Sequence, residues 1–80
     1  MTLEEIIEAF PDEGFLRCDG LDAAVIGVDQ KTMNLVYSVE KCIEVMVNDQ
    51  GMDHEEAREF LDFNTFGAYV GPKTPIYIYD

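Results

Sequence analysis

The residue types that could support catalysis or metal binding are few and widely spaced in this sequence. His54 is the only histidine, and the two cysteines, Cys18 and Cys42, do not form a CxxC pair. Asp19 and Asp22 lie in a turn-rich, glycine-containing segment, where paired carboxylates can bind a divalent cation or act as general acid and base. Asp19, Asp22 and His54 are therefore the candidates for a small metal-dependent or carboxylate-based enzyme.

The spacing of these residues does not favour that enzyme. A zinc site would need Cys18, Cys42 and His54 to converge with a carboxylate, and no two of them have the short spacing typical of zinc ligands. The two aspartates do not match an EF-hand loop. General acid and base catalysis also needs a pocket that shifts pKa values, which a chain of 80 residues rarely supplies. We expect no catalytic residue, no metal site and no cofactor.

The strongest signal is the acidity of the chain. Seventeen acidic residues face five basic ones, which gives a formal net charge of −12. Direct binding to nucleic acid or to an anionic membrane surface is therefore not expected, because both depend on Lys and Arg. Seven glutamates fall on outward or first-turn positions of the expected helices and form the candidate partner-binding surface: Glu4, Glu8, Glu40, Glu44, Glu55, Glu56 and Glu59.

Three interpretations of this acidity stay open. The charge can serve solubility alone. It can instead imitate the phosphates of a nucleic acid and occupy the basic groove of a nucleic-acid-binding protein, with electrostatic steering that gives a fast association rate. The third interpretation is a basic protein partner that is recognised without mimicry.

Capping signals predict where the helices begin and end. Thr2 and Glu5 form a capping box that begins a helix over residues 3–10. Ser38 can N-cap a second helix, which Gly51 closes in the left-handed conformation.

The third helix begins at another capping box, formed by Asp53 and Glu56, and is expected to end between Phe63 and Gly67.

Short apolar runs predict three strands. Residues 23–28 and 33–37 read as a β-hairpin, and residues 76–79 have the β-branched and aromatic composition of a strand. With a 48% hydrophobic composition the chain is expected to fold. The element order αββααβ predicts one α+β domain over residues 1–80. We expect its three-stranded, mostly antiparallel sheet to be covered by helices on one face.

The last strand has no polar face, so both of its sides need burial or a partner. It can pair with a second copy of the chain, or it can lie centrally in the sheet. A homodimer is therefore an alternative, with a candidate interface of Tyr69, Ile76, Tyr77, Ile78 and Tyr79.

The chain starts without the basic and apolar regions of a signal peptide, and its two cysteines show no disulfide framework. No apolar stretch approaches the roughly 20 residues that a membrane-spanning helix needs. We therefore expect a cytoplasmic protein with reduced thiols.

Four segments of the sequence resemble one family. They are DGLDAAVIGV from Asp19, LVYSVEKCIEVMV from Leu35, GMDHEEAREFLDFN from Gly51 and GAYVGPKTPIYIY from Gly67. Together they cover about three-quarters of the chain and are similar to small proteins of tailed bacteriophages and prophages. The resemblance implies an origin and carries no catalytic residue or cofactor.

From this resemblance and the acidity, we expect a non-catalytic phage accessory protein that acts by protein–protein binding in the host cytoplasm. Its partner would be a host-side protein. One form of that binding is the inhibition of a host or defence protein through an acidic, nucleic-acid-like surface. The enzyme described above is the alternative.

Overall fold

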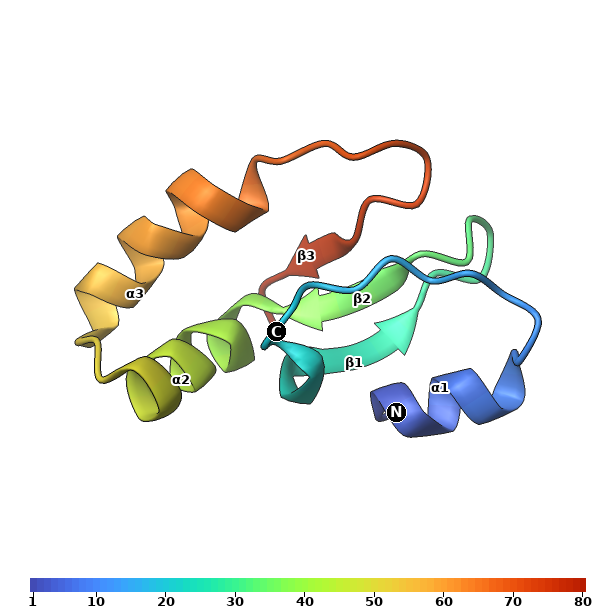
Figure 1. Ribbon diagram of the computed structural model, residues 1–80, viewed down its shortest axis with the longest axis horizontal. Helices are drawn as coiled ribbons and strands as arrows, with labels where there is room; N and C mark the ends of the chain where they lie inside the picture. The colour runs from blue at the N-terminus through green and yellow to red at the C-terminus, as the bar shows by residue number, and fades with distance from the viewer.

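The computed structural model describes residues 1–80, and its elements follow the order helix, two strands, two helices and a strand (Figure 1). The helices are α1 (Leu3–Ala9), α2 (Val39–Gln50) and α3 (His54–Leu61), and the strands are β1 (Val25–Val28), β2 (Leu35–Ser38) and β3 (Ile76–Ile78). A 3-10 turn, η1 (Asp22–Ala24), precedes β1, and a π-helical turn, η2 (Asp62–Phe66), follows α3. The predicted α+β class and element order are confirmed.

Two capping boxes begin α1 and α3, as the sequence predicts. The Thr2 hydroxyl accepts a hydrogen bond from the Glu5 amide at 3.2 Å, and the Glu5 carboxylate accepts one from the Thr2 amide at 2.8 Å. These hydrogen bonds with Thr2 lower the pKa of Glu5. Asp53 and Glu56 make the same reciprocal pair at α3. Each box satisfies two amide groups that a helix start would leave unpaired.

Ser38 joins β2 to α2 and ties both to the C-terminus. Its hydroxyl accepts a hydrogen bond from the Lys41 amide and donates one to the Asp80 carboxylate at 2.5 Å. At the other end of α2, Gly51 has a φ of 70°, the left-handed conformation of a C′ glycine. Ser38 and Gly51, the two residues predicted from the sequence, therefore cap the two ends of α2.

Replacing Gly51 with alanine is expected to lower the free energy of unfolding by about 1 kcal/mol, because a Cβ disfavours positive φ. Nothing else lies within 4 Å of the position a Cβ would take. Gly14 has the same open surroundings without a positive φ, so Gly14→Ala is the matched control and should leave stability unchanged or slightly raised. Urea unfolding of both variants measures the difference, and equal stabilities would contradict this assignment.

The sheet has the order β1-β2-β3. β1 and β2 form the expected antiparallel hairpin, with a bulge between Val25 and Gly27. β3 instead runs parallel to β2, with Tyr37 opposite Tyr77. The antiparallel expectation therefore holds for one of the two strand pairs, and the sheet is mixed. A parallel pair needs a long crossover connection, which α2, α3 and the segment after them provide.

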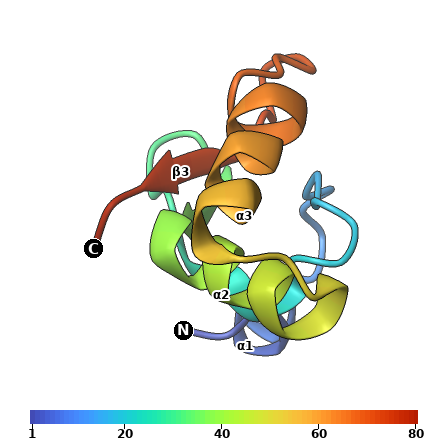
Figure 2. The same cartoon turned by 90° about the vertical axis from the view of Figure 1, so that its left-hand side faces the viewer.

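The core is centred on Tyr37 in the middle strand. Its side chain is fully buried, and its ring centroid lies 5.6 Å from that of Tyr77. Phe66 in η2 also packs against Tyr77, with 4.8 Å between the ring centroids. α1 packs against β1, while α2 packs against η1 and α3. Figure 2 shows α3 lying over α2, with the strand β3 extending beside them.

The outer edge of β1 is occupied by the start of the chain. The N-terminal ammonium of Met1 donates a hydrogen bond to the carbonyl of Ile26 at 3.1 Å. β3 forms the opposite edge of the sheet, where it pairs only with β2. The C-terminal strand is therefore an edge strand.

Candidate functional site

The seven glutamates predicted to form an acidic surface all lie exposed on the three helices. Glu4 and Glu8 belong to α1, Glu40 and Glu44 to α2, and the remaining three to α3. Glu56 also accepts the hydrogen bond of its capping box, so it has a structural role in addition. The fold places these carboxylates in solvent, where a partner can reach them.

Few of the acidic groups have a cationic partner within the chain. The structure contains two ion pairs, Arg58 with Asp62 at 3.1 Å and Lys73 with Glu13 at 3.2 Å. None of the seven glutamates takes part in either. Fifteen of the seventeen acidic side chains thus have no ion pair within the chain.

The three residues of the alternative enzyme lie at separate places. Asp19 lines a pocket next to Cys18. Asp22 begins η1 and lines a different hollow, beside α1. His54 is exposed in the first turn of α3 and lines neither of them. No group of three His, Cys, Asp or Glu side chains is arranged to hold a metal ion. The structure does not bring the candidate catalytic residues together.

Two tyrosines hold the segment around Cys18 against the sheet. The Cys18 amide donates a hydrogen bond to the Tyr37 hydroxyl at 2.8 Å, and the Cys18 sulfur lies 2.8 Å from the Tyr77 hydroxyl. Burial raises the pKa of Tyr37 to about 12, and it raises the pKa of Tyr77 as well. Burial also raises the pKa of the Cys42 thiol to about 12. These groups stay protonated at neutral pH, so they act as hydrogen-bonding and packing groups.

These raised pKa values predict a loss of stability at alkaline pH. Between about pH 9 and about pH 12 the unfolded chain releases protons that folded Tyr37 and Cys42 retain, so the free energy of unfolding falls as pH rises. Below about pH 9 both groups keep their protons in the folded and in the unfolded chain, so the stability that they contribute is fully present there. Urea unfolding across that range measures the decline. In Tyr37→Phe, which cannot ionise at this position, the decline should be shallower, whereas identical slopes would contradict the assignment.

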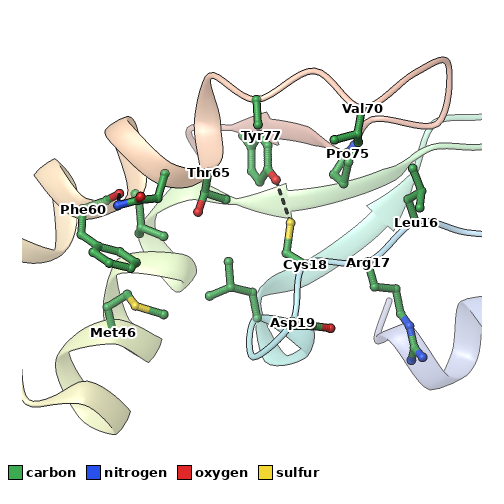
Figure 3. Close-up of a pocket in the computed structure, with 14 residues that line it drawn as sticks. Leu16, Arg17, Cys18, Asp19, Met46, Phe60, Thr65, Val70, Pro75 and Tyr77 are labelled. Atoms are coloured by element: carbon green, nitrogen blue, oxygen red, sulfur yellow. Dashed lines mark hydrogen bonds between the residues drawn. The ribbon is translucent and has the colours of Figure 1, made fainter.

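An apolar pocket of about 390 Å³ opens beside this cysteine. Figure 3 shows it between the segment after α1, the end of α3 and the approach to β3. Its lining is mainly hydrophobic and includes Leu16, Met46, Phe60, Val70, Pro75 and Tyr77. The size lies within the range of small-ligand sites, and several of its lining side chains remain accessible to solvent.

No sequence pattern indicates this pocket. Leu16, which is 42% exposed, and Val70, which is 60% exposed, come from irregular segments far apart in the chain. Helical periodicity identifies Phe60 as inward-facing, but it is 43% exposed because it forms a pocket wall. One feature of the sequence does point to the pocket. The stretch from Phe60 to Val70 is rich in apolar residues, although most of it lies after α3 and outside any α-helix or strand.

The residues of the candidate oligomer interface face different surroundings. Tyr77 is half-buried and packs against Tyr37 and Phe66. Tyr79 lies against Arg58, whose guanidinium carbon is 5.0 Å from the ring centroid and which also donates a hydrogen bond to the tyrosine hydroxyl. Tyr69 and Ile78 are exposed, and Ile76 is half-buried. These five residues therefore do not share one open surface, although β3 itself lies at a sheet edge.

The fold and this surface define a small, strongly acidic α+β domain with a mixed three-stranded sheet and an apolar pocket. None of its helices is long and apolar enough to cross a membrane. No family model, curated protein or solved structure matches the chain.

Proposed function

We propose that this chain is a non-catalytic binding protein whose helix carboxylates bind a cationic surface of another protein. The observation that carries the proposal is the set of fifteen acidic side chains without an internal ion pair. Like charges crowded on a small domain oppose its compact state, and a cationic partner relieves that repulsion. The charge thus favours association with a basic surface.

The arrangement of the carboxylates supports a nucleic-acid-like mode of binding. They are distributed over three helices of a molecule whose longest dimension is 37 Å. Negative groups spread over that length can take the places of phosphates in a basic groove, and they also steer the encounter. The partner in this proposal is a host-side nucleic-acid-binding protein, whose groove the chain occupies and inhibits.

The resemblance to small proteins of tailed bacteriophages and prophages supports the setting of this proposal. A phage accessory protein would meet its partner in the host cytoplasm, where a host or defence protein that binds nucleic acid is the target. The strings around Asp19, Leu35, Gly51 and Gly67 carry that resemblance.

Affinity capture from a bacterial host lysate tests the proposal. At low ionic strength the immobilised chain should retain a Lys- and Arg-rich protein, and high ionic strength or added duplex DNA should release it, because both weaken or compete with carboxylate contacts. A capture experiment that yields no salt-sensitive partner would refute the proposed function. A captured partner that DNA does not displace would refute the nucleic-acid-like mode alone.

Homodimerisation through β3 is the second candidate, favoured by the edge position of that strand. Two copies would bring together net charges of −12 each, so the dimer should form more readily when salt screens the repulsion. Sedimentation equilibrium at low and high salt measures this, and a monomer mass under both conditions would exclude the dimer.

A further inference from the structure

The apolar pocket borders an acidic hollow on the surface of α3. Phe60 and Asn64 line both depressions. The second one also contains Glu56, Glu59 and Phe63, and Phe63 is 89% exposed. The two depressions are therefore neighbours separated by Phe60 and Asn64, and together they are called the α3 groove below.

The sequence of α3 places an acidic and an apolar side chain on the same side of the helix. Glu56, Phe60 and Asn64 follow at intervals of four residues, so they lie above one another on one side of the helix. The Asn64 side-chain amide donates a hydrogen bond to the Phe60 carbonyl at 3.0 Å, in the π-helical turn. The groove is thus acidic near the start of α3 and apolar near its end.

The acidic hollow has no cation in its lining, and the apolar pocket has one. Asp19 and Arg17 both line the pocket. Arg17, however, also lines the hollow that contains Glu4 and Asp22, and Figure 3 shows its side chain directed away from Cys18 toward α1. The hollow that contains Glu56 and Glu59 has no Lys or Arg in its lining, and Arg58, their neighbour in the sequence, forms its ion pair with Asp62.

We propose that the α3 groove binds a basic peptide segment of the partner, with an apolar side chain in the pocket and Lys or Arg beside Glu56 and Glu59. This inference rests on the proposed function and names the part of the partner that is recognised. Charge complementarity selects this occupant over a second copy of the chain, which would bring another net charge of −12 to an acidic groove. The apolar pocket supplies the anchor that carboxylates alone lack.

The probe is a synthetic, fluorescently labelled peptide of leucines flanked by lysines, and two control peptides change one feature each. One replaces the leucines with serine, and the other replaces the lysines with glutamate. Burying one leucine side chain should make the leucine–lysine peptide bind about tenfold or more tightly than the serine control. The glutamate control should not bind, because it meets Asp19, Glu56 and Glu59.

A matched pair of variants locates the binding. Ala68 lines the pocket and is exposed, so Ala68→Trp fills the pocket without disturbing the core. Tyr69 is 79% exposed and lies outside the lining, so Tyr69→Trp is the control. Affinity for the leucine–lysine peptide should fall about tenfold in the first variant and stay within about twofold in the second.

Thiol protection gives a readout on the unmodified chain. Cys18 is half-buried at the pocket and Cys42 is fully buried, so alkylation of the folded protein should occur at Cys18. The leucine–lysine peptide should slow that alkylation, and the serine control should not. This measurement does not depend on how well any variant folds.

The inference is overturned if the leucine and serine peptides bind equally, if Ala68→Trp leaves affinity unchanged, or if Cys18 is alkylated at the same rate with and without peptide. It is also overturned if the glutamate control binds as tightly as the lysine peptide, since the pocket would then take apolar ligands of any charge. Salt-sensitive capture of a partner would survive each of these results, which separates the failure of this inference from that of the proposed function.

Discussion

Truncation of Tyr37 to alanine is expected to lower the free energy of unfolding by about 3–5 kcal/mol, the range for large aromatic side chains removed from a core. The ring is fully buried in the central strand and packs against Tyr77. Its hydroxyl also accepts the Cys18 amide hydrogen bond, so the variant loses the contact that holds the pocket-forming segment. In a domain of this size such a loss removes a large part of the total stability. Urea unfolding measures it.

Two further variants separate the contributions of ring and hydroxyl. Tyr37→Phe keeps the ring and leaves the Cys18 amide without an acceptor, so it should cost about 1–3 kcal/mol. Tyr69→Ala removes an exposed tyrosine and should change stability by no more than about 0.5 kcal/mol. If Tyr37→Ala were as mild as Tyr69→Ala, Tyr37 would not be the centre of the core.

The association rate with the captured partner is expected to fall by about tenfold or more as ionic strength rises. Electrostatic steering raises association rates by about 10–1000-fold at low salt, and this chain carries a net charge of −12. The Debye length shortens from about 30 Å at about 0.01 M ionic strength to about 8 Å at the physiological value of about 0.15 M. Stopped-flow or surface-based kinetics at the two ionic strengths measure the effect.

The dissociation rate provides the internal control for this prediction. Steering acts on the encounter, so the dissociation rate should change much less with salt than the association rate does. An association rate that is independent of salt would mean that the carboxylates do not guide the partner, and the acidity would then serve solubility alone.

Local signals in the sequence predicted where the helices begin and where α2 ends, whereas α3 ends at Leu61, earlier than the expected Phe63 to Gly67, and a π-helical turn follows it. Thr2, Ser38 and Asp53 cap the helices that they were expected to begin, and Gly51 closes α2 with positive φ. These features depend on residues within one helical turn of each other, so the sequence contains all the information that they need. The hairpin of β1 and β2 is equally local.

Features that depend on distant contacts were not predictable in the same way. The parallel pairing of β3 with β2 depends on how the chain returns after α3, and no single residue type marks it. The Tyr37, Tyr77 and Cys18 cluster joins three segments through hydrogen bonds that span 19 and 59 residues. The pocket arises from the same convergence, so it too required the structure.

Long-range polar contacts fix the approach to β3 as well. The buried side-chain amide of Asn34 donates hydrogen bonds to the carbonyls of Pro72 and Thr74, each at 3.0 Å. The hydroxyl of Thr74 in turn accepts a hydrogen bond from the Val70 amide, which shapes the far wall of the pocket. The segment after α3 is irregular, yet its course is set by these contacts with the hairpin.

The sequence predicts that the acidic surface exists and which glutamates are exposed on it, but it does not predict the ion pairs. Helical spacing correctly placed all seven glutamates in solvent, since period alone decides which side of a helix faces outward. The sequence could not show which carboxylates pair with the few cations, because the Lys73 and Glu13 pair joins opposite ends of the chain. The structure thereby separates carboxylates that are free to bind from those already paired.

The most direct test of carboxylate-mediated binding compares two quadruple variants with equal net charge. One neutralises acids on α2 and α3: Glu40→Gln, Glu44→Gln, Glu55→Gln and Glu59→Gln. The other neutralises acids outside the proposed surface, including both that are already ion-paired: Asp12→Asn, Glu13→Gln, Asp22→Asn and Asp62→Asn. The first set is expected to lower affinity for the captured partner at least about fourfold more than the second, at about 0.2–1 kcal/mol for each of four exposed contacts. Equal losses in both variants would show that only bulk charge matters and would contradict it.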